Sequence, residues 1–114
     1  MTVQFSQVQF AVSESEYVKI QNKEITVESI SPRKIAGRIT KAFDNIPIPR
    51  IGESISDSYW PRDFTEQKIA DICYNYSDDS CVVYLEPFFM VEGSAAHNEL
   101  KRIAELHGWQ FHMI

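Results

Sequence analysis

Apolar and polar residues alternate along the first third of the chain, and this alternation predicts β-strands. Within residues 2–12 the apolar positions change phase at Ser6–Gln7, which predicts a bulge or a tight turn at that point. The stretches EYVKI (16–20) and EITVESI (24–30) are rich in β-branched residues and predict further strands, with a turn at 21–23 between them. The first third is therefore expected to be sheet.

The clearest element is a hairpin of two alternating segments, 70–76 and 81–86. Turn-forming residues separate the two segments, and a turn centred on Asp78–Asp79 pairs Tyr76 with Cys81. In this register the apolar side chains of both strands lie on one face of the sheet.

The two cysteines, Cys73 and Cys81, lie on opposite strands of that hairpin. In the predicted register their sulfurs are separated by roughly 10 Å along the strands. A disulfide requires Cα atoms within about 7 Å of each other. The sequence therefore predicts two free thiols, at least one of them buried.

The last third predicts a helix followed by a short strand. Residues 95–107 have a period of 3.6, with an apolar face that includes Ala96, Leu100 and Ile103. Gly108 is suited to end this helix, because glycine readily adopts the left-handed conformation found just past helix ends. The closing residues, WQFHMI, predict a strand that pairs into the sheet.

Residues 32–43 fit both a helix and a strand. Ser31 and Pro32 suit the first positions of a helix, whereas Gly37 inside one costs about 1 kcal/mol. The apolar residues of the segment also alternate acceptably for a strand. The balance favours a helix.

Taken together, the elements predict the α+β class. Residues 1–114 are expected to form a single small domain, in which a curved antiparallel β-sheet is packed by the C-terminal helix, with a second helix at 32–43.

The segment 46–53, IPIPRIGE, is unusual for its two prolines. Pro47 and Pro49 push the residues before them into extended conformations and cannot donate to a sheet ladder. We expect a stiff connection that leads into the sheet and blunts an edge. The motif IPRIGE ahead of an alternating hairpin, over about residues 46–86, resembles a pattern in small uncharacterised proteins of bacteria and their phages. That resemblance implies a compact sheet-based domain and carries no functional residues.

Composition narrows the class of protein. The chain is 44% hydrophobic and 24% charged, as in ordinary globular proteins. Its longest apolar runs are far too short to span a bilayer, and the N-terminus lacks the features of a signal peptide. We therefore expect a cytoplasmic protein without a membrane partner.

No motif predicts a cofactor, a metal site or a catalytic residue. The three histidines, His97, His107 and His112, lack the spacing of metal ligands, and the four glycines form no phosphate-binding loop. A small enzyme of unknown reaction remains one alternative, which would need carboxylates or a Cys–His pair in a pocket.

Charge is unevenly distributed. The net charge is −5, and beyond residue 57 the chain has nine acidic and four basic residues. This excess of acids disfavours a nucleic-acid partner. The one basic cluster consists of Arg33, Lys34, Arg38 and Lys41, which on a helix form a stripe of candidate phosphate contacts. A nucleotide-binding or nucleic-acid-binding accessory protein is the corresponding alternative.

The strongest remaining signal is an aromatic connection. Candidate protein-binding residues there are Tyr59, Trp60, Arg62 and Phe64, because tyrosine, tryptophan and arginine dominate binding hot spots. The segment PFFMV, residues 87–91, adds further rings between sheet and helix. The favoured hypothesis is a small non-enzymatic protein-binding module, such as an inhibitor, immunity-type protein or phage-encoded modulator of a host protein. A second copy of the chain is a further candidate partner.

Overall fold

The structure, a computed structural model, describes residues 1–62 and 65–113. Within these ranges it contains seven strands and three α-helices. The strands are β1 (Thr2–Val12), β2 (Ile35–Asp44), β3 (Ser54–Ser56), β4 (Glu66–Asn75), β5 (Ser80–Leu85), β6 (Phe88–Val91) and β7 (Gln110–His112). The helices are α1 (Glu14–Gln21), α2 (Ala95–Asn98) and α3 (Leu100–Leu106).

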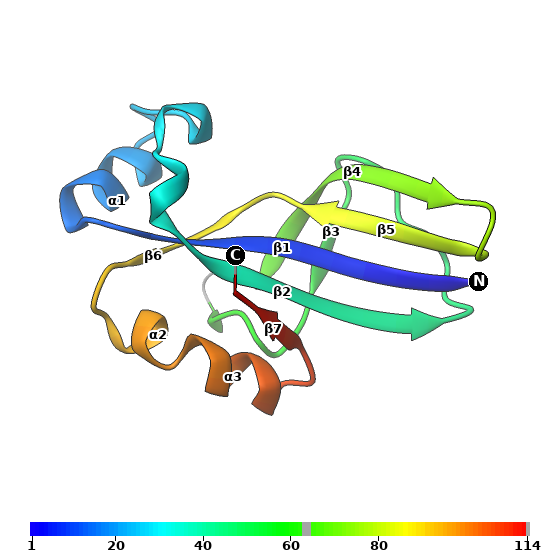
Figure 1. Ribbon diagram of the computed structural model, residues 1–114. Coiled ribbons are helices and arrows are strands. Elements are labelled where there is room, and N and C mark those ends of the chain that lie inside the picture. The colour runs from blue at the N-terminus through cyan, green and yellow to red at the C-terminus, as the bar shows by residue number, and fades with distance from the viewer. Residues whose placement is uncertain (63–64, 114) are drawn as a thin grey trace.

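The long strand β1 organises the sheet. On one side it pairs antiparallel with β2, and on the other it pairs parallel with β5 along its first half and with β6 along its second half. The strand order is β3-β4-β5-β1-β2-β7, with β6 following β5 beside β1 (Figure 1). The predicted α+β class is confirmed, and the sheet is mixed rather than wholly antiparallel.

Both faces of β1 are buried, which explains its apolar positions in both phases. On one face Val3, Phe5 and Ala11 join the main core, which α3 helps to cover through Leu100 and Ala104. On the other face a smaller cluster forms around Phe10, Val12 and Ile30, with Tyr17 and Ile20 of α1 packed against it. The phase change predicted as a bulge at Ser6–Gln7 is continuous strand, and the irregularity lies between Gln9 and Phe10.

The prediction of a helix at 32–43 is wrong. Ser31 does cap a helical turn, but this is a single 3₁₀ turn over Pro32–Lys34, where the Ser31 hydroxyl accepts a hydrogen bond from the Arg33 backbone N–H. From Ile35 the chain is strand β2, which pairs with β1 as far as Asp44. Pairing with β1, whose residues lie 25 to 42 positions earlier in the chain, outweighs the local helix signal.

The strand predictions for EYVKI and EITVESI are also wrong. Residues 14–21 form α1, which begins with a capping box: the Ser13 hydroxyl accepts from the Glu16 N–H, and the Glu16 carboxylate accepts from the Ser13 N–H. This reciprocal cap satisfies backbone donors at the helix start. Residues 24–30 contain a 3₁₀ turn at Val27–Ser29 in place of a strand.

The hairpin of β4 and β5 is confirmed, but its register differs by two residues. Tyr74, not Tyr76, pairs with Cys81. The reason is local: the Asn75 carboxamide oxygen accepts hydrogen bonds from the N–H and hydroxyl of Ser77, so the turn begins one residue after Asn75. Both cysteines are free, with Cys81 buried and Cys73 exposed, as predicted.

The C-terminal helix and strand are confirmed, with one interruption. The helix is split at Glu99 into α2 and α3, and Gly108 follows it with a φ of 84°. Strand β7 then pairs with β2. The proline-rich segment connects β2 to the edge strand β3, and its Ile46 and Ile48 pack against the main core.

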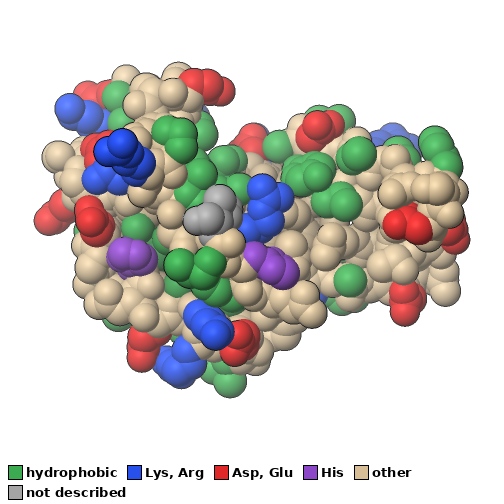
Figure 2. All heavy atoms as spheres, viewed as in Figure 1, with side chains coloured by type: hydrophobic (Ala, Val, Ile, Leu, Met, Phe, Trp, Pro, Cys, Tyr) green, Lys and Arg blue, Asp and Glu red, His purple; other side chains and the backbone are tan. Residues whose placement is uncertain are grey.

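The end of the sheet at which the chain begins is acidic. Asp44 ends β2, and Asp78 and Asp79 lie in the turn between β4 and β5, so all three carboxylates belong to this end. In Figure 2 the charged side chains visible there are mostly acidic.

The close packing of Gly37 against β7 leaves little room for a side chain at this position of β2. A Cβ at this position would lie 2.4 Å from the Phe111 ring of β7, closer than two carbons can approach. We expect Gly37→Ala to lower the free energy of unfolding by about 1–3 kcal/mol, as overpacking typically does. Urea unfolding of the single variants and of the pair Gly37→Ala/Phe111→Ala measures this. The alanine should cost less when Phe111 is already truncated, with the remaining cost coming from the His112 carbonyl oxygen 3.0 Å from the added Cβ and from the φ of 159°. An unchanged cost would contradict the close packing against Phe111.

Candidate functional site

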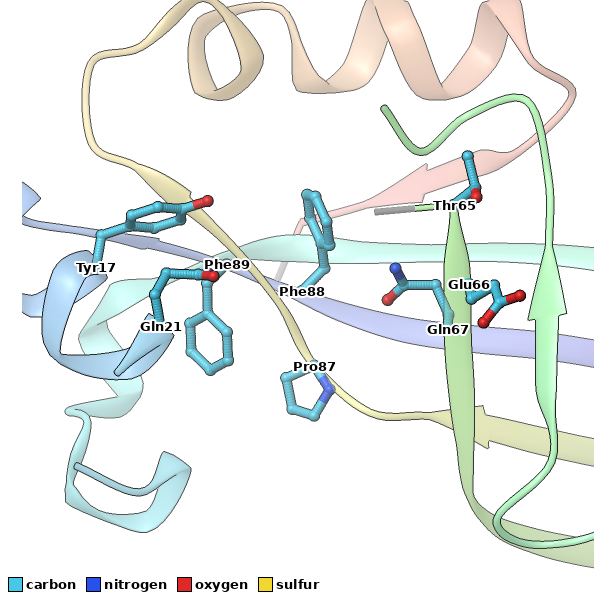
Figure 3. Close-up of a pocket in the computed structure, with 8 residues that line it drawn as sticks. All are labelled: Tyr17, Gln21, Thr65, Glu66, Gln67, Pro87, Phe88 and Phe89. Atoms are coloured by element: carbon cyan, nitrogen blue, oxygen red, sulfur yellow. The ribbon is translucent and has the colours of Figure 1, made fainter. Parts of the chain in front are cut away.

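A groove runs along β6, and we call it the β6 groove. It consists of three adjoining cavities of about 410, 260 and 210 Å³, which share the Phe88 side chain. Figure 3 shows the largest of them, with Tyr17 and Gln21 of α1 on one side of β6 and Thr65 and Gln67 on the other. The groove is therefore bordered by a helix, a strand edge and the start of β4.

The β6 groove exists because β4 and β6 diverge. Strand β4 pairs with β5 as far as Ile69 opposite Leu85, with an irregularity between Ile69 and Asp71. Pro87 then separates β5 from β6, and among the described residues β6 pairs only with β1. The start of β4 and the outer edge of β6 are left facing each other across an open slot.

The lining combines an apolar centre with polar ends. Phe88, Phe89 and Met90 of β6 contribute the centre, together with Pro61. The Phe89 ring is held by stacking on Phe10, with centroids 5.2 Å apart. Amide and hydroxyl groups lie toward α1 and toward the start of β4. This pattern suits an apolar group that also needs a few hydrogen bonds.

Two buried glutamines of β1 lie beneath the groove. Gln7 and Gln9 are 1% and 0% exposed. The Gln7 carboxamide oxygen accepts hydrogen bonds from the Trp60 indole N–H at 2.9 Å and from the Gln9 amide at 2.8 Å. The Tyr59 hydroxyl donates to the Gln9 oxygen at 3.0 Å, and the Gln7 amide donates to Gln67 at 2.8 Å. The network ties the aromatic connection to β1 and to the groove wall.

The predicted hot-spot residues differ in exposure. Tyr59 and Trp60 are 9% and 2% exposed and pack against Trp109, whose ring centroid is 5.4 Å from that of Trp60. Burial raises the pKa of the Tyr59 hydroxyl well above its usual value. Both side chains nevertheless form one wall of the groove. Arg62 is exposed, and Phe64 lies outside the described residues. Their role in protein binding stays a prediction.

Sequence reasoning missed the glutamines and α1. A signal for the glutamines was present, because Gln7 and Gln9 continue the inward phase of Val3 and Phe5 in a strand. A polar side chain at an inward position needs a buried partner. The signal for α1 was the S-x-x-E pattern at Ser13 and Glu16. The PFFMV segment was singled out, but its meeting with the 59–61 segment was not predicted.

The predicted basic stripe does not form, because residues 35–44 are a strand. Alternation along β2 places Arg38 and Lys41 on opposite faces of the sheet. Arg38 donates to the Ser6 hydroxyl at 3.1 Å, whereas Lys41 contacts the carboxylate of Asp57 at 3.0 Å. Each cation thus has its own intramolecular partner.

The other two basic residues, Arg33 and Lys34, line a separate cavity of about 350 Å³ with Glu92 and His97. The Lys34 ammonium lies 3.7 Å from the Glu92 carboxylate and 3.9 Å from that of Glu16. These acids offset the positive charge that a phosphate group would require. The geometry does not favour a phosphate site.

A polar cluster that begins with Ser58, a residue of the groove lining, resembles catalytic machinery only in part. The Ser58 hydroxyl lies 2.8 Å from Nδ1 of His107. A nucleophilic serine also needs a group that orients its histidine. The neighbouring carboxylate, Asp57, instead accepts hydrogen bonds from Lys41 and the Trp109 indole. The cluster is therefore organised to hold the 57–60 connection against α3 and β2.

Asp57 has a perturbed acidity. Burial by itself raises the pKa of its carboxyl group, but hydrogen bonds from Trp109, from the Tyr59 N–H and from Lys41 outweigh burial and lower the pKa below the ordinary value of 3.8. The ionised carboxylate therefore contributes to stability.

Residues 1–62 and 65–113 contain neither a cluster of metal ligands nor a membrane-spanning helix. In these ranges no three His, Cys, Asp or Glu side chains gather as a metal ion would need. Over the same residues, none of the helices has the length and apolar character needed to cross a bilayer. Comparison of the chain with protein-family models, curated proteins and solved structures gave no match.

Because Trp60 is buried and Arg62 is exposed, replacing each with alanine should change the free energy of unfolding by different amounts. We expect Trp60→Ala to lower the free energy of unfolding by about 3–5 kcal/mol, because it removes a packed ring from the core. Arg62→Ala should change it by less than about 0.5 kcal/mol, as for other exposed residues. Denaturant titration of both variants measures the difference. Equal, small effects would show that the 59–62 connection is not part of the core.

The lowered pKa of Asp57 predicts how the stability of the fold changes with pH. Because its pKa is lower in the folded state than in the unfolded chain, its contribution to stability is complete above pH 3.8 and is lost as pH falls toward the lowered pKa. The stability difference between the wild type and Asp57→Asn should therefore narrow as pH falls below about 4. Thermal unfolding at a series of pH values measures it. A difference that stays constant down to pH 2 would contradict the assignment.

Proposed function

We propose that the chain is a small protein-binding module that takes an extended segment of a partner protein in the β6 groove. One observation carries this proposal: two aromatic segments far apart in the sequence, 59–61 and 88–90, line one continuous groove beside a strand edge. Aromatic walls of this kind supply the anchoring contacts of protein interfaces.

The form of the groove supports an extended occupant. The Glu92 N–H donates to the Val12 carbonyl of β1, so every second backbone unit of β6 faces β1. By the alternation of a strand, the N–H groups of Phe89 and Val91 point to the opposite side, toward the groove. An added strand accepts hydrogen bonds from such an edge and places alternate side chains in pockets.

The chemistry of the lining narrows the occupant further. Its apolar centre suits aromatic or branched aliphatic side chains, and its amide-bearing ends suit backbone groups of the bound segment. A module that holds a segment of another protein in this way acts by occupying it, which is the action of an inhibitor or modulator. The dispersal of the four basic residues gives no comparable support to nucleotide binding.

The proposal can be tested with a displayed library of random twelve-residue peptides, selected on the purified protein. We expect enrichment of peptides with apolar residues at alternate positions. Gln21→Trp places a bulky ring at the groove from the exposed end of α1, and it should weaken the selected peptides about tenfold or more. Val18→Trp, at an exposed position of α1 that does not line the groove, is the matched control.

A second measurement tests the mode of binding. Methylation of alternate backbone nitrogens removes every second N–H of a selected peptide. In strand addition only one of the two phases faces β6, so one methylated series should lose binding and the other should keep it. Peptides that bind the Gln21→Trp variant as well as the wild type would refute the site. If both methylated series lost binding to the same extent, strand addition would be refuted as the mode of binding.

A further inference from the structure

The tip of the β4–β5 hairpin, residues 74–80, carries an exposed pair of aromatic rings. The rings of Tyr74 and Tyr76 are stacked, with centroids 6.1 Å apart and planes within 6° of parallel. Tyr74 is 46% exposed and Tyr76 is 86% exposed. Since turns usually hold small polar residues, a large ring this exposed in a turn is available for contact with another molecule.

The pairing of the strands shows what lies beside these rings. Tyr74 is opposite Cys81, Cys81 is next to Val3 of β1, and Val3 is opposite Phe43 at the end of β2. Cys81 and Val3 are fully buried, while Phe43 is 38% exposed. Tyr74 therefore belongs to a well-packed row of the sheet, and Tyr76 stacks on it from the turn. Contact with a ring already placed in this way costs little ordering of the chain.

The charge around the rings is negative. Asp78 and Asp79 lie in the turn itself, and Asp44 ends the strand at the far side of the same end of the sheet. The Asp79 carboxylate is largely exposed and lies 3.4 Å from the amino group of Met1, which also donates to the Asn45 side chain. Of these three carboxylates, Asp79 pairs with the amino group, while Lys41, whose ammonium lies 5.7 Å from the Phe43 ring centroid, is already paired with Asp57.

The excess of negative charge extends over the whole β4–β5 hairpin. Between residues 66 and 86 the chain has five acidic residues and one basic residue, Lys68. Lys68 pairs with Ser54 at the end of β4 away from the turn. The tip therefore combines exposed aromatic rings with an excess of negative charge, a pattern complementary to cationic side chains.

We propose that the hairpin tip is a second interaction surface, which docks on a basic protein surface through arginine side chains. A guanidinium group is planar and stacks on an aromatic face, where the ring quadrupole attracts it. The neighbouring carboxylates attract the same cation over a longer range and accelerate the encounter. Arginine satisfies both features at once, whereas lysine satisfies mainly the charge.

The surface is independent of the β6 groove. Strand β1 pairs with Ser80 at Thr2 and with Phe89 at Phe10, so the two sites lie at opposite ends of this strand. Eight residues of strand separate them by roughly 26 Å. Figure 1 shows the N-terminus beside the hairpin turn and β6 at the other end of β1. A partner could occupy either surface without obstructing the other.

The test uses two peptides of equal charge, one with four arginines alternating with glycine and one with four lysines in the same places. Each is titrated into the isotopically labelled protein at low ionic strength, and amide shifts are followed by NMR. We expect the shifts to concentrate at residues 74–81, and the arginine peptide to bind about two- to fivefold more tightly than the lysine peptide.

Variants separate stacking from charge. Tyr76→Ser should abolish the preference for arginine, and Tyr76→Phe should keep it, because the ring and not the hydroxyl makes the contact. The pair Asp78→Asn/Asp79→Asn should weaken both peptides to a similar extent, since it removes charge alone. Leu106→Ser removes another exposed apolar side chain, on α3, and should change neither affinity. The amide spectrum of each variant reports directly whether the fold is intact.

Two outcomes would overturn the proposal. Shifts spread over Glu92, Glu99 and Glu105 would indicate general attraction of cations by the acidic half. A preference for arginine that persists in Tyr76→Ser would show that the Tyr76 ring, the more exposed of the two, does not carry it. The Gln21→Trp variant should bind both peptides normally, so failure at the hairpin tip and failure at the β6 groove are distinguishable.

Discussion

The buried side-chain amide of Gln7 is the constraint on which the site depends. A carboxamide buried in a protein interior without hydrogen-bond partners strongly destabilises the folded state, because each unsatisfied donor and acceptor has lost its hydrogen bonds to water. Here the Gln7 oxygen accepts from Trp60 and Gln9, and its amide nitrogen donates to Gln67 and to the Glu86 carbonyl. Because each bond is directional and shielded from water, this one side chain sets the positions of the aromatic connection, the start of β4 and the chain that leaves β5.

The length of β1 explains why a groove lies above that network. A strand of eleven residues is longer than β5, so two successive segments, β5 and β6, lie along the same side of it. The proline between those segments ends the first pairing, and β4 follows β5 but not β6. The open edge of β6 is thus a consequence of sheet topology. Aromatic residues border this edge, which is of the kind that otherwise favours aggregation.

The two ends of β1 have different chemistry. At one end the β6 groove is concave and largely apolar, and burial of side chains would dominate binding there. At the other end the hairpin tip is convex, acidic and aromatic, and long-range charge would contribute more. Basic residues that a helix would have gathered into a third surface are separated by strand alternation and held by Ser6 and Asp57. The same backbone pairing that builds the sheet therefore disperses one candidate surface and isolates two others.

Elements whose signals are local can be predicted from the sequence. The hairpin, the C-terminal helix and its terminal glycine, and the free thiols follow from turn residues and periodicity over a few positions. The tertiary structure alone decided that 35–44 is a strand, because its pairing with β1 outweighs a favourable helix cap at Ser31. It also decided that Tyr59 and Trp60 are buried, since their partners Gln9 and Gln7 lie about fifty residues earlier in the chain. Propensity acts between neighbours in sequence, whereas burial and strand pairing depend on residues that only folding brings together.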